Sequence, residues 1–121
     1  MGEDKIQTIL TDLNGSSEDI EASALISTDG LVISSALTAG MDDDRISAMV
    51  AAMLSLGDRT AAELSLGSLE QVLISGAQGY VLIIHASNAA VLCIIANKPI
   101  KLGLLFVVAS RAARAATALL Q

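Results

Sequence analysis

The chain has 121 residues, of which 53% are hydrophobic and only 2% aromatic, so it can form one domain with an aliphatic core. A formal net charge of −6 argues against nucleic acid or an anionic membrane surface as a partner, because both attract clusters of Lys and Arg. A single cysteine, Cys93, excludes an intrachain disulfide and is typical of a reducing compartment, so we expect a cytoplasmic protein. The longest apolar stretch, Tyr80 to Ala96, is interrupted by polar residues, so no transmembrane helix is predicted.

The first half of the chain predicts a helix, a β-hairpin and a second, longer helix. Apolar spacing predicts the first helix over residues 2–13, and Asn14-Gly15 should end it in a left-handed conformation. Strands are predicted over 20–27 and 31–36, joined by Asp29-Gly30, a pair that favours a tight hairpin turn. The acids at positions 42–44 should cap the second helix, which is predicted to run to about Leu64.

The second predicted helix carries two unusual faces. One is an apolar stripe that should face the core and consists of Ile46, Met49, Val50, Met53 and Gly57. The opposite face is rich in small residues where a solvated helix would carry Glu and Lys, and it comprises Ala48, Ala51, Ala52, Ser55, Leu56, Arg59 and Ala62. A second packing partner for this helix is therefore implied. The methionines at 41, 49 and 53 are interpreted as core residues.

The second half of the chain predicts a three-stranded meander and a closing helix. The strands are predicted over 69–75, 80–86 and 91–96, and the helix over about 102–120. The last two strands are apolar on both alternating faces, so helices should cover both faces of the sheet. The closing helix should bury Leu102, Leu105, Phe106, Ala109, Ala113, Ala116 and Leu120. No repeat or linker divides the chain, which predicts a single domain over 1–121.

The residues offer no catalytic, cofactor or metal site. With a turn over Ser87 to Ala90, His85 should face Leu92 while Cys93 faces Ile84 on the opposite side of the sheet, which excludes a Cys–His dyad. The acids at 42–44 lack the spacing of a calcium loop and are interpreted as a helix cap. Because no phosphate-binding glycine loop occurs, we expect the chain itself to bind no nucleotide.

The order of elements, together with ALISTDGLVIS from Ala24 to Ser34 and KLGLLFVVASRAARAA from Lys101, resembles the roadblock/dynein-light-chain family over about residues 4–120. The resemblance implies a small, single-domain, prokaryotic member with an α/β fold of order α-β-β-α-β-β-β-α. Its five-stranded antiparallel sheet would carry the middle helix on one face and the terminal helices on the other. Two protomers would join through their third strands and middle helices, and the interface residues would be Ala48, Ala51, Ala52, Ser55, Gln71 and Leu73.

The resemblance also implies a function, because roadblock proteins act as scaffolds and as regulators of small GTPases without an active site of their own. We therefore expect a non-catalytic homodimer that binds a Ras-like small GTPase, with Asp44, Arg45, Asp58 and Arg59 at the rim of the contact. Arg45 and Arg59 are interpreted as solvated helix charges rather than arginine fingers. Two alternatives stay open: a structural adaptor without a GTPase partner, and a small-molecule sensor of profilin-like or PAS-like fold.

Overall fold

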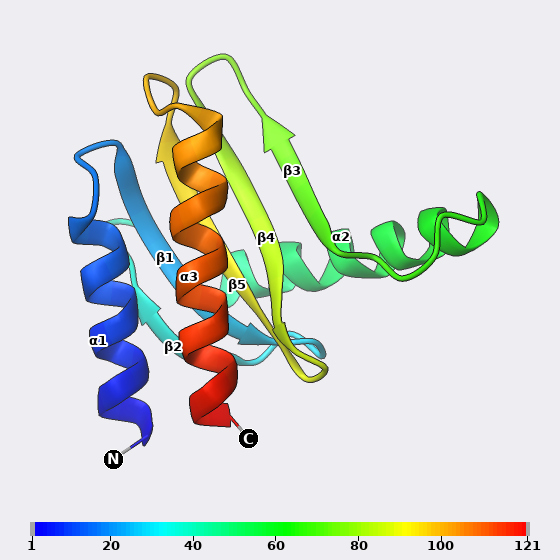
Figure 1. The fold of residues 1–121 in the computed structure, drawn as a ribbon, viewed down its shortest axis with the longest axis horizontal. Helices are drawn as coiled ribbons and strands as arrows, with labels where there is room; N and C mark the ends of the chain where they lie inside the picture. The colour runs from blue at the N-terminus through cyan, green and yellow to red at the C-terminus, as the bar shows by residue number, and fades with distance from the viewer. Residues whose placement is uncertain (1, 121) are drawn as a thin grey trace.

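Three helices and five strands follow one another in the predicted order in the computed structural model, which describes residues 2–120 (Figure 1). Their bounds are α1 Gly2–Gly15, β1 Ile20–Ser27, β2 Val32–Ala36, α2 Asp43–Glu63, β3 Gln71–Ser75, β4 Gly79–Ser87, β5 Ala90–Asn97 and α3 Leu102–Leu120. The predicted α-β-β-α-β-β-β-α order is confirmed, and the single-domain prediction over 1–121 stays a prediction.

All strand pairs in the sheet are antiparallel, and the strand order is β2-β1-β5-β4-β3. The chain therefore places β5 at the centre and leaves β2 and β3 at the two edges. Figure 1 shows α1 and α3 side by side and antiparallel on one face, while α2 crosses the other face. This layering confirms the predicted fold class.

The strands alternate between two hydrophobic cores, one on each face. On the face of α1 and α3, Leu25, Leu82 and Leu92 are fully buried against Leu10 and Leu105. On the face of α2, the buried cluster is Ala24, Ile26, Val50, Leu54, Ile83, Val91 and Cys93. Each strand residue therefore points into one core and its neighbour into the other, which explains why β4 and β5 are apolar at successive positions.

Of the two turns predicted in the first half of the chain, the hairpin turn at Asp29-Gly30 is confirmed and the left-handed stop at Gly15 was wrong. Gly30 has a φ of +91° and lies in the four-residue loop between β1 and β2, across which the Ser27 N–H donates to the carbonyl oxygen of Leu31 at 2.8 Å. The left-handed stop at Gly15 was wrong, since α1 includes Gly15, which is not among the residues with positive φ. Ser16 ends the helix instead, because both its N–H and its hydroxyl donate to the carbonyl oxygen of Leu13, at 3.1 and 2.6 Å.

Helix α3 is apolar around most of its circumference. Its mean hydropathy is 1.5 over an 18-residue window of its 19 residues, so length and composition alone would let it cross a membrane, although the core helix of a globular domain can have the same length and composition. Here its inner side packs on the sheet, with Leu105, Ala109 and Ala116 buried. Leu102, predicted to be inside, is 36% exposed because it lies at the first residue of the helix.

Candidate interaction surface

Helix α2 begins at the acidic cluster and then extends past the edge of the sheet. The Asp42 carboxylate accepts hydrogen bonds from the backbone N–H groups of Asp44 and Arg45, at 3.0 and 3.3 Å. Oxygens of Asp42, Asp43 and Asp44 lie within 4.8 Å of one another, and capping together with the helix dipole accounts for the cluster. Figure 1 shows that the C-terminal half of α2 projects beyond β3.

The inward face of α2 differs from the predicted stripe at Met49. Ser47, Val50, Leu54 and Ala61 are buried, and together they fix the direction in which the helix faces the sheet. Met49 lies about 100° around the helix from Val50 and is 51% exposed, so its assignment to the core was wrong. Met41 and Met53 are half-buried. Met49 and Leu56, the latter 67% exposed, instead give the outer face two large apolar side chains.

The small residues of α2 divide between two surroundings. Ala48, Ala52 and Ser55 are exposed on the outer face, where a second chain could approach closely. Ala51 is half-buried against the hairpin of its own protomer, because a Cβ atom built on Gly30 would lie 3.2 Å from the Ala51 Cβ. The small size of Ala51 therefore has an explanation within one chain.

Strand β3 forms an open edge beside the projecting helix. It pairs with β4 alone, and Gln71 and Leu73 are both exposed. Leu73 is opposite Leu82 and so points to the α3 side, whereas Val72 and Ile74 point to α2. Between α2 and β3 lies an apolar groove of about 380 Å³, lined by Met53, Leu56, Gly57, Thr60, Ala61, Leu66, Leu69, Val72 and Ile74.

An unpaired strand edge and exposed apolar side chains occur together at this surface. Leu56, Leu66 and Ile74 line the groove and are 67%, 69% and 44% exposed. A free edge exposes backbone N–H and C=O groups that pair readily with another strand, and a contiguous apolar patch marks a contact site. The outer face of α2, the groove and the β3 edge together are called the α2–β3 surface below.

The four charged residues predicted at the rim form two separate pairs on α2. Asp44 and Arg45 lie in the first turn, and Asp58 and Arg59 are 14 residues further along, which is roughly 20 Å of helix. Arg59 donates to Glu63 in an i,i+4 ion pair, with 3.2 Å between Nε and Oε1. Sequence reasoning missed Glu63, although its spacing from Arg59 indicates this pair.

His85 and Cys93 are paired across β4 and β5 with residues other than the predicted ones. His85 is opposite Val91 and Cys93 is opposite Ile83, because the pairing shifts between His85 and Ser87. Val91 and Ile83 both belong to the core on the α2 side, so His85 and Cys93 share one face of the sheet, and the prediction that they lie on opposite faces was wrong. The turn itself is at Ser87 to Ala90 as predicted, so this bulge moves every pair by one residue. Burial raises the pKa of the Cys93 thiol to about 12, which keeps it protonated and non-nucleophilic at neutral pH.

Comparison with known proteins gives relatives in sequence and in structure. A protein of Methanocaldococcus jannaschii, described as uncharacterized protein MJ0310, is 36% identical over 108 residues, covering 89% of this chain and 93% of the relative. MglB of Myxococcus xanthus has a TM-score of 0.90 at 19% identity, over 98% of this chain and 89% of that one. A structure of MglB with a tetrameric arrangement has a TM-score of 0.87 at 16% identity, with the same coverage of the two chains.

The structural neighbours are too distant in sequence to indicate more than a shared fold. The family is shown by sequence, since the model of the Roadblock/LC7 domain matches residues 6–96. This range begins in α1 and ends in β5, so it includes α2 and the whole sheet except Asn97. The chain therefore belongs to the Roadblock/LC7 family.

Proposed function

We propose that the protein is a non-catalytic, cytoplasmic homodimer that binds a Ras-like small GTPase. The observation that supports this most directly is the projection of α2 beyond β3, with apolar side chains left uncovered on it. Family membership adds the expected class of partner, because the roadblock resemblance implies GTPase regulation. The fold alone does not specify the partner.

In the proposed dimer, β3 pairs with β3 of a second copy and the two α2 helices lie against each other. The projecting half of each α2 then covers the partner's sheet, and the partner's helix fills the groove that contains Leu56 and Ile74. Ala52 and Ser55 allow close helix approach because they have small side chains. Gln71 and Leu73 belong to the strand edge that pairs.

The paired α2 helices form the proposed platform for the GTPase. Their exposed surface is edged by Asp44 and Arg45 at one end and by Asp58 and Arg59 at the other. A platform of small side chains admits a partner closely, while a charged rim orients it. Since Arg59 is already paired with Glu63, we expect the dimer to position the GTPase's own catalytic groups rather than insert an arginine.

The test measures binding of purified Ras-like GTPases from the source organism, loaded with GDP or with a non-hydrolysable GTP analogue. We expect one nucleotide state to bind more tightly, and Asp44→Arg to weaken binding about tenfold or more by reversing a charge at the rim of the contact. Arg114→Ala, on the opposite layer of the molecule, is the matched control and should bind like wild type. Each variant is first shown to keep the wild-type mass.

Turnover by the bound GTPase separates positioning from direct catalysis. Arg45→Ala, Arg59→Ala and the double variant should retain any stimulation of GTP hydrolysis. Loss of stimulation with unchanged binding in one of them would identify an arginine finger. If no GTPase binds in either nucleotide state while the chain is dimeric, the structural adaptor is the correct function.

A further inference from the structure

The outer face of α1 and α3 lies on the opposite side of the sheet from α2, and we propose that it is a second contact between copies of this chain. Through it, dimers would assemble into particles of four chains or more. This inference rests on the proposed dimer only for the number of chains in the particle. The contact itself is argued from the residues of α1 and α3.

Helix α3 has a second apolar stripe on the side that faces away from the sheet. At 3.6 residues per turn, the residues on this stripe are Leu104, Val107, Val108, Arg111, Ala115 and Ala118. Leu104 and Val107 are 44% and 48% exposed. A helix that is apolar on nearly all sides is usually covered on all sides, so this stripe lacks a partner within one chain.

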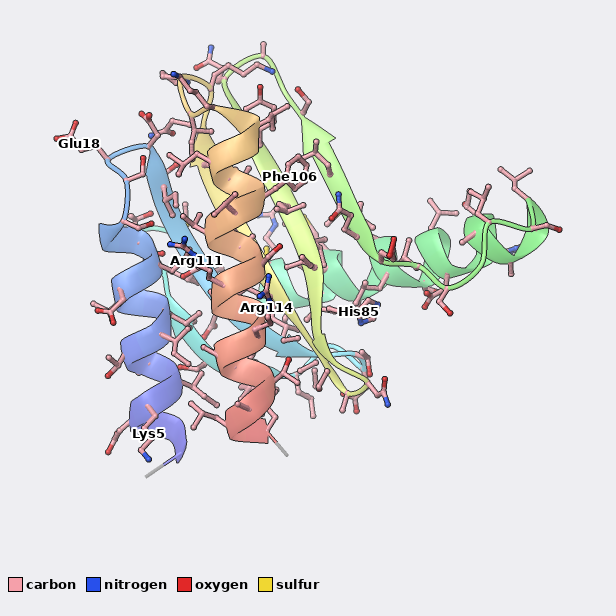
Figure 2. All side chains as sticks on the ribbon, in the orientation of Figure 1. Lys5, Glu18, His85, Phe106, Arg111 and Arg114 are labelled. Atoms are coloured by element: carbon pink, nitrogen blue, oxygen red, sulfur yellow. The ribbon has the colours of Figure 1, made fainter. Side chains whose placement is uncertain are left out.

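The stripe borders a groove between α3 and α1. The groove has a volume of about 290 Å³ and is lined by Ile9, Asp12, Leu13, Ser16, Val108, Arg111, Ala112 and Ala115. Its floor is aliphatic, and its two charges come from different helices, Asp12 from α1 and Arg111 from α3. Figure 2 shows Arg111 reaching from α3 toward α1, whereas Arg114 lies on the other flank of α3.

Asp12 and Arg111 are available to a partner. Over residues 4–120, whose side chains the structure describes, neither side chain has a salt bridge or a hydrogen bond, although both line the same groove. An acid on one helix and a base on the next make the face self-complementary. A twofold axis through the layer places α1 of one copy on α3 of the other, so that each Asp12 meets the partner's Arg111.

The opposite charges of Asp12 and Arg111 at the groove favour a second copy of the chain over an anionic partner. All 13 acidic residues precede Lys98, whereas four of the seven basic residues lie at Lys98 or later. Lys98 itself is held by Ser75 and Gly76, with Nζ distances of 2.7 and 3.0 Å, and by the Tyr80 ring. An anionic lipid surface that attracts Arg111 would also meet Asp12 beside it, while a second copy satisfies both charges.

Charge reversal with rescue tests the contact by multi-angle light scattering at low salt. We expect wild type at four or more times the 12.4 kDa chain mass, and Asp12→Arg and Arg111→Asp each at twice that mass. The double variant D12R/R111D should recover the larger particle, because the attraction is restored with its sign exchanged. Glu18→Arg makes the same change of charge as Asp12→Arg in the turn after α1, where Figure 2 shows the side chain pointing away from the groove, and should leave the particle intact.

The outcomes separate this contact from the α2–β3 dimer. If wild type has two chains and Asp12→Arg has one, the α1–α3 contact stands and the α2–β3 dimer fails. A wild-type particle of two chains that Asp12→Arg leaves unchanged overturns the inference, as does a double variant that stays small. Sedimentation of wild type, but not Arg111→Asp, with phosphatidylglycerol vesicles at unchanged mass overturns it in favour of a lipid surface.

Discussion

At the level of single residues, Gly79 is set by a close backbone contact rather than by turn geometry. It is opposite Asn97, and a Cβ atom at this position would lie 2.5 Å from the carbonyl oxygen of Ala96. Gly79→Ala should therefore lower the free energy of unfolding by about 2 kcal/mol, because strand β5 must move. Urea unfolding at fixed protein concentration measures the change.

Gly103 supplies the control for Gly79. No atom lies within 4 Å of a Cβ built there, and the residue is helical. Gly103→Ala should raise the free energy of unfolding by at most about 1 kcal/mol through the higher helix propensity of alanine. Equal losses at both positions would mean that the contact with Ala96 does not determine the cost at Gly79.

Cys93 should make the protein less stable in alkali. Its pKa is raised from 9.0 to about 12 by burial, so above pH 9.0 the unfolded thiol releases a proton that the folded thiol keeps. The contribution of Cys93 to the free energy of unfolding is fully present below pH 9.0. It is lost as the pH rises toward 12, at up to about 1.4 kcal/mol per pH unit.

The measurement for Cys93 compares the slope of unfolding free energy against pH in wild type and in Cys93→Ala. Other groups titrate in the same range, and they are common to both proteins. The wild-type slope should be steeper above pH 9.0. Identical slopes would show that the thiol ionises in the folded protein as readily as in the unfolded one.

At the level of elements, α2 is followed by a residue in a strained backbone conformation, which a substitution can relieve. Ser65 has a φ of +57°, in the left-handed region, while the N–H groups of Ser65 and Leu66 donate to the carbonyl oxygens of Ala62 and Ala61, at 3.2 and 2.8 Å. These are the two hydrogen bonds of a Schellman motif, in which glycine is the preferred residue at the position of Ser65.

Ser65→Gly should therefore stabilise the protein by about 1 kcal/mol, because glycine adopts positive φ without a Cβ clash. The melting temperature should rise by roughly 4 °C for a domain of this size. Ser68→Gly, in the same loop and exposed, is the control and should bring no such gain. A lower melting temperature for Ser65→Gly would show that the serine makes a contact that outweighs its strain.

The elements were largely predictable because they depend on local patterns. Alternating and helical spacing of aliphatic residues predicted eight elements, and Asp29-Gly30 predicted the first hairpin. The bulge at the end of β4 was not predictable, since the spacing of residues 80–96 does not show which residue is extra. Met49 was misplaced for a related reason: an apolar side chain fits either face of a helix that is apolar on two sides.

At the level of the whole molecule, the α2–β3 surface predicts association. Light scattering should show no monomer at high micromolar concentration. Ala52→Arg should break the α2–β3 contact by placing a charge between closely packed helices, whereas Arg111→Ala should leave that contact in place. A wild-type chain that stays at 12.4 kDa would contradict the proposed dimer.

The candidate surface was only partly predictable at this scale. The small residues of α2 indicated that a partner approaches, and that property is visible in the sequence. The projection of α2 beyond β3 depends on where the helix crosses the sheet, which only the packing of Val50 and Leu54 decides. The apolar groove between helix and strand edge is a result of that crossing.

The helical order of the projecting half of α2 should also depend on protein concentration. Its last turns lie beyond the sheet edge, and of their residues Ala61 is buried whereas Arg59, Thr60, Ala62 and Glu63 are exposed. A short isolated helix is marginal in water. Dilution should therefore let these turns fray before the sheet unfolds, so that backbone amides after Ala61 exchange with solvent deuterium faster at low concentration than at high. Amides of β5, enclosed between two cores, should exchange at rates that follow global unfolding. Assembly would thus complete the folding of the helix through which the protein assembles.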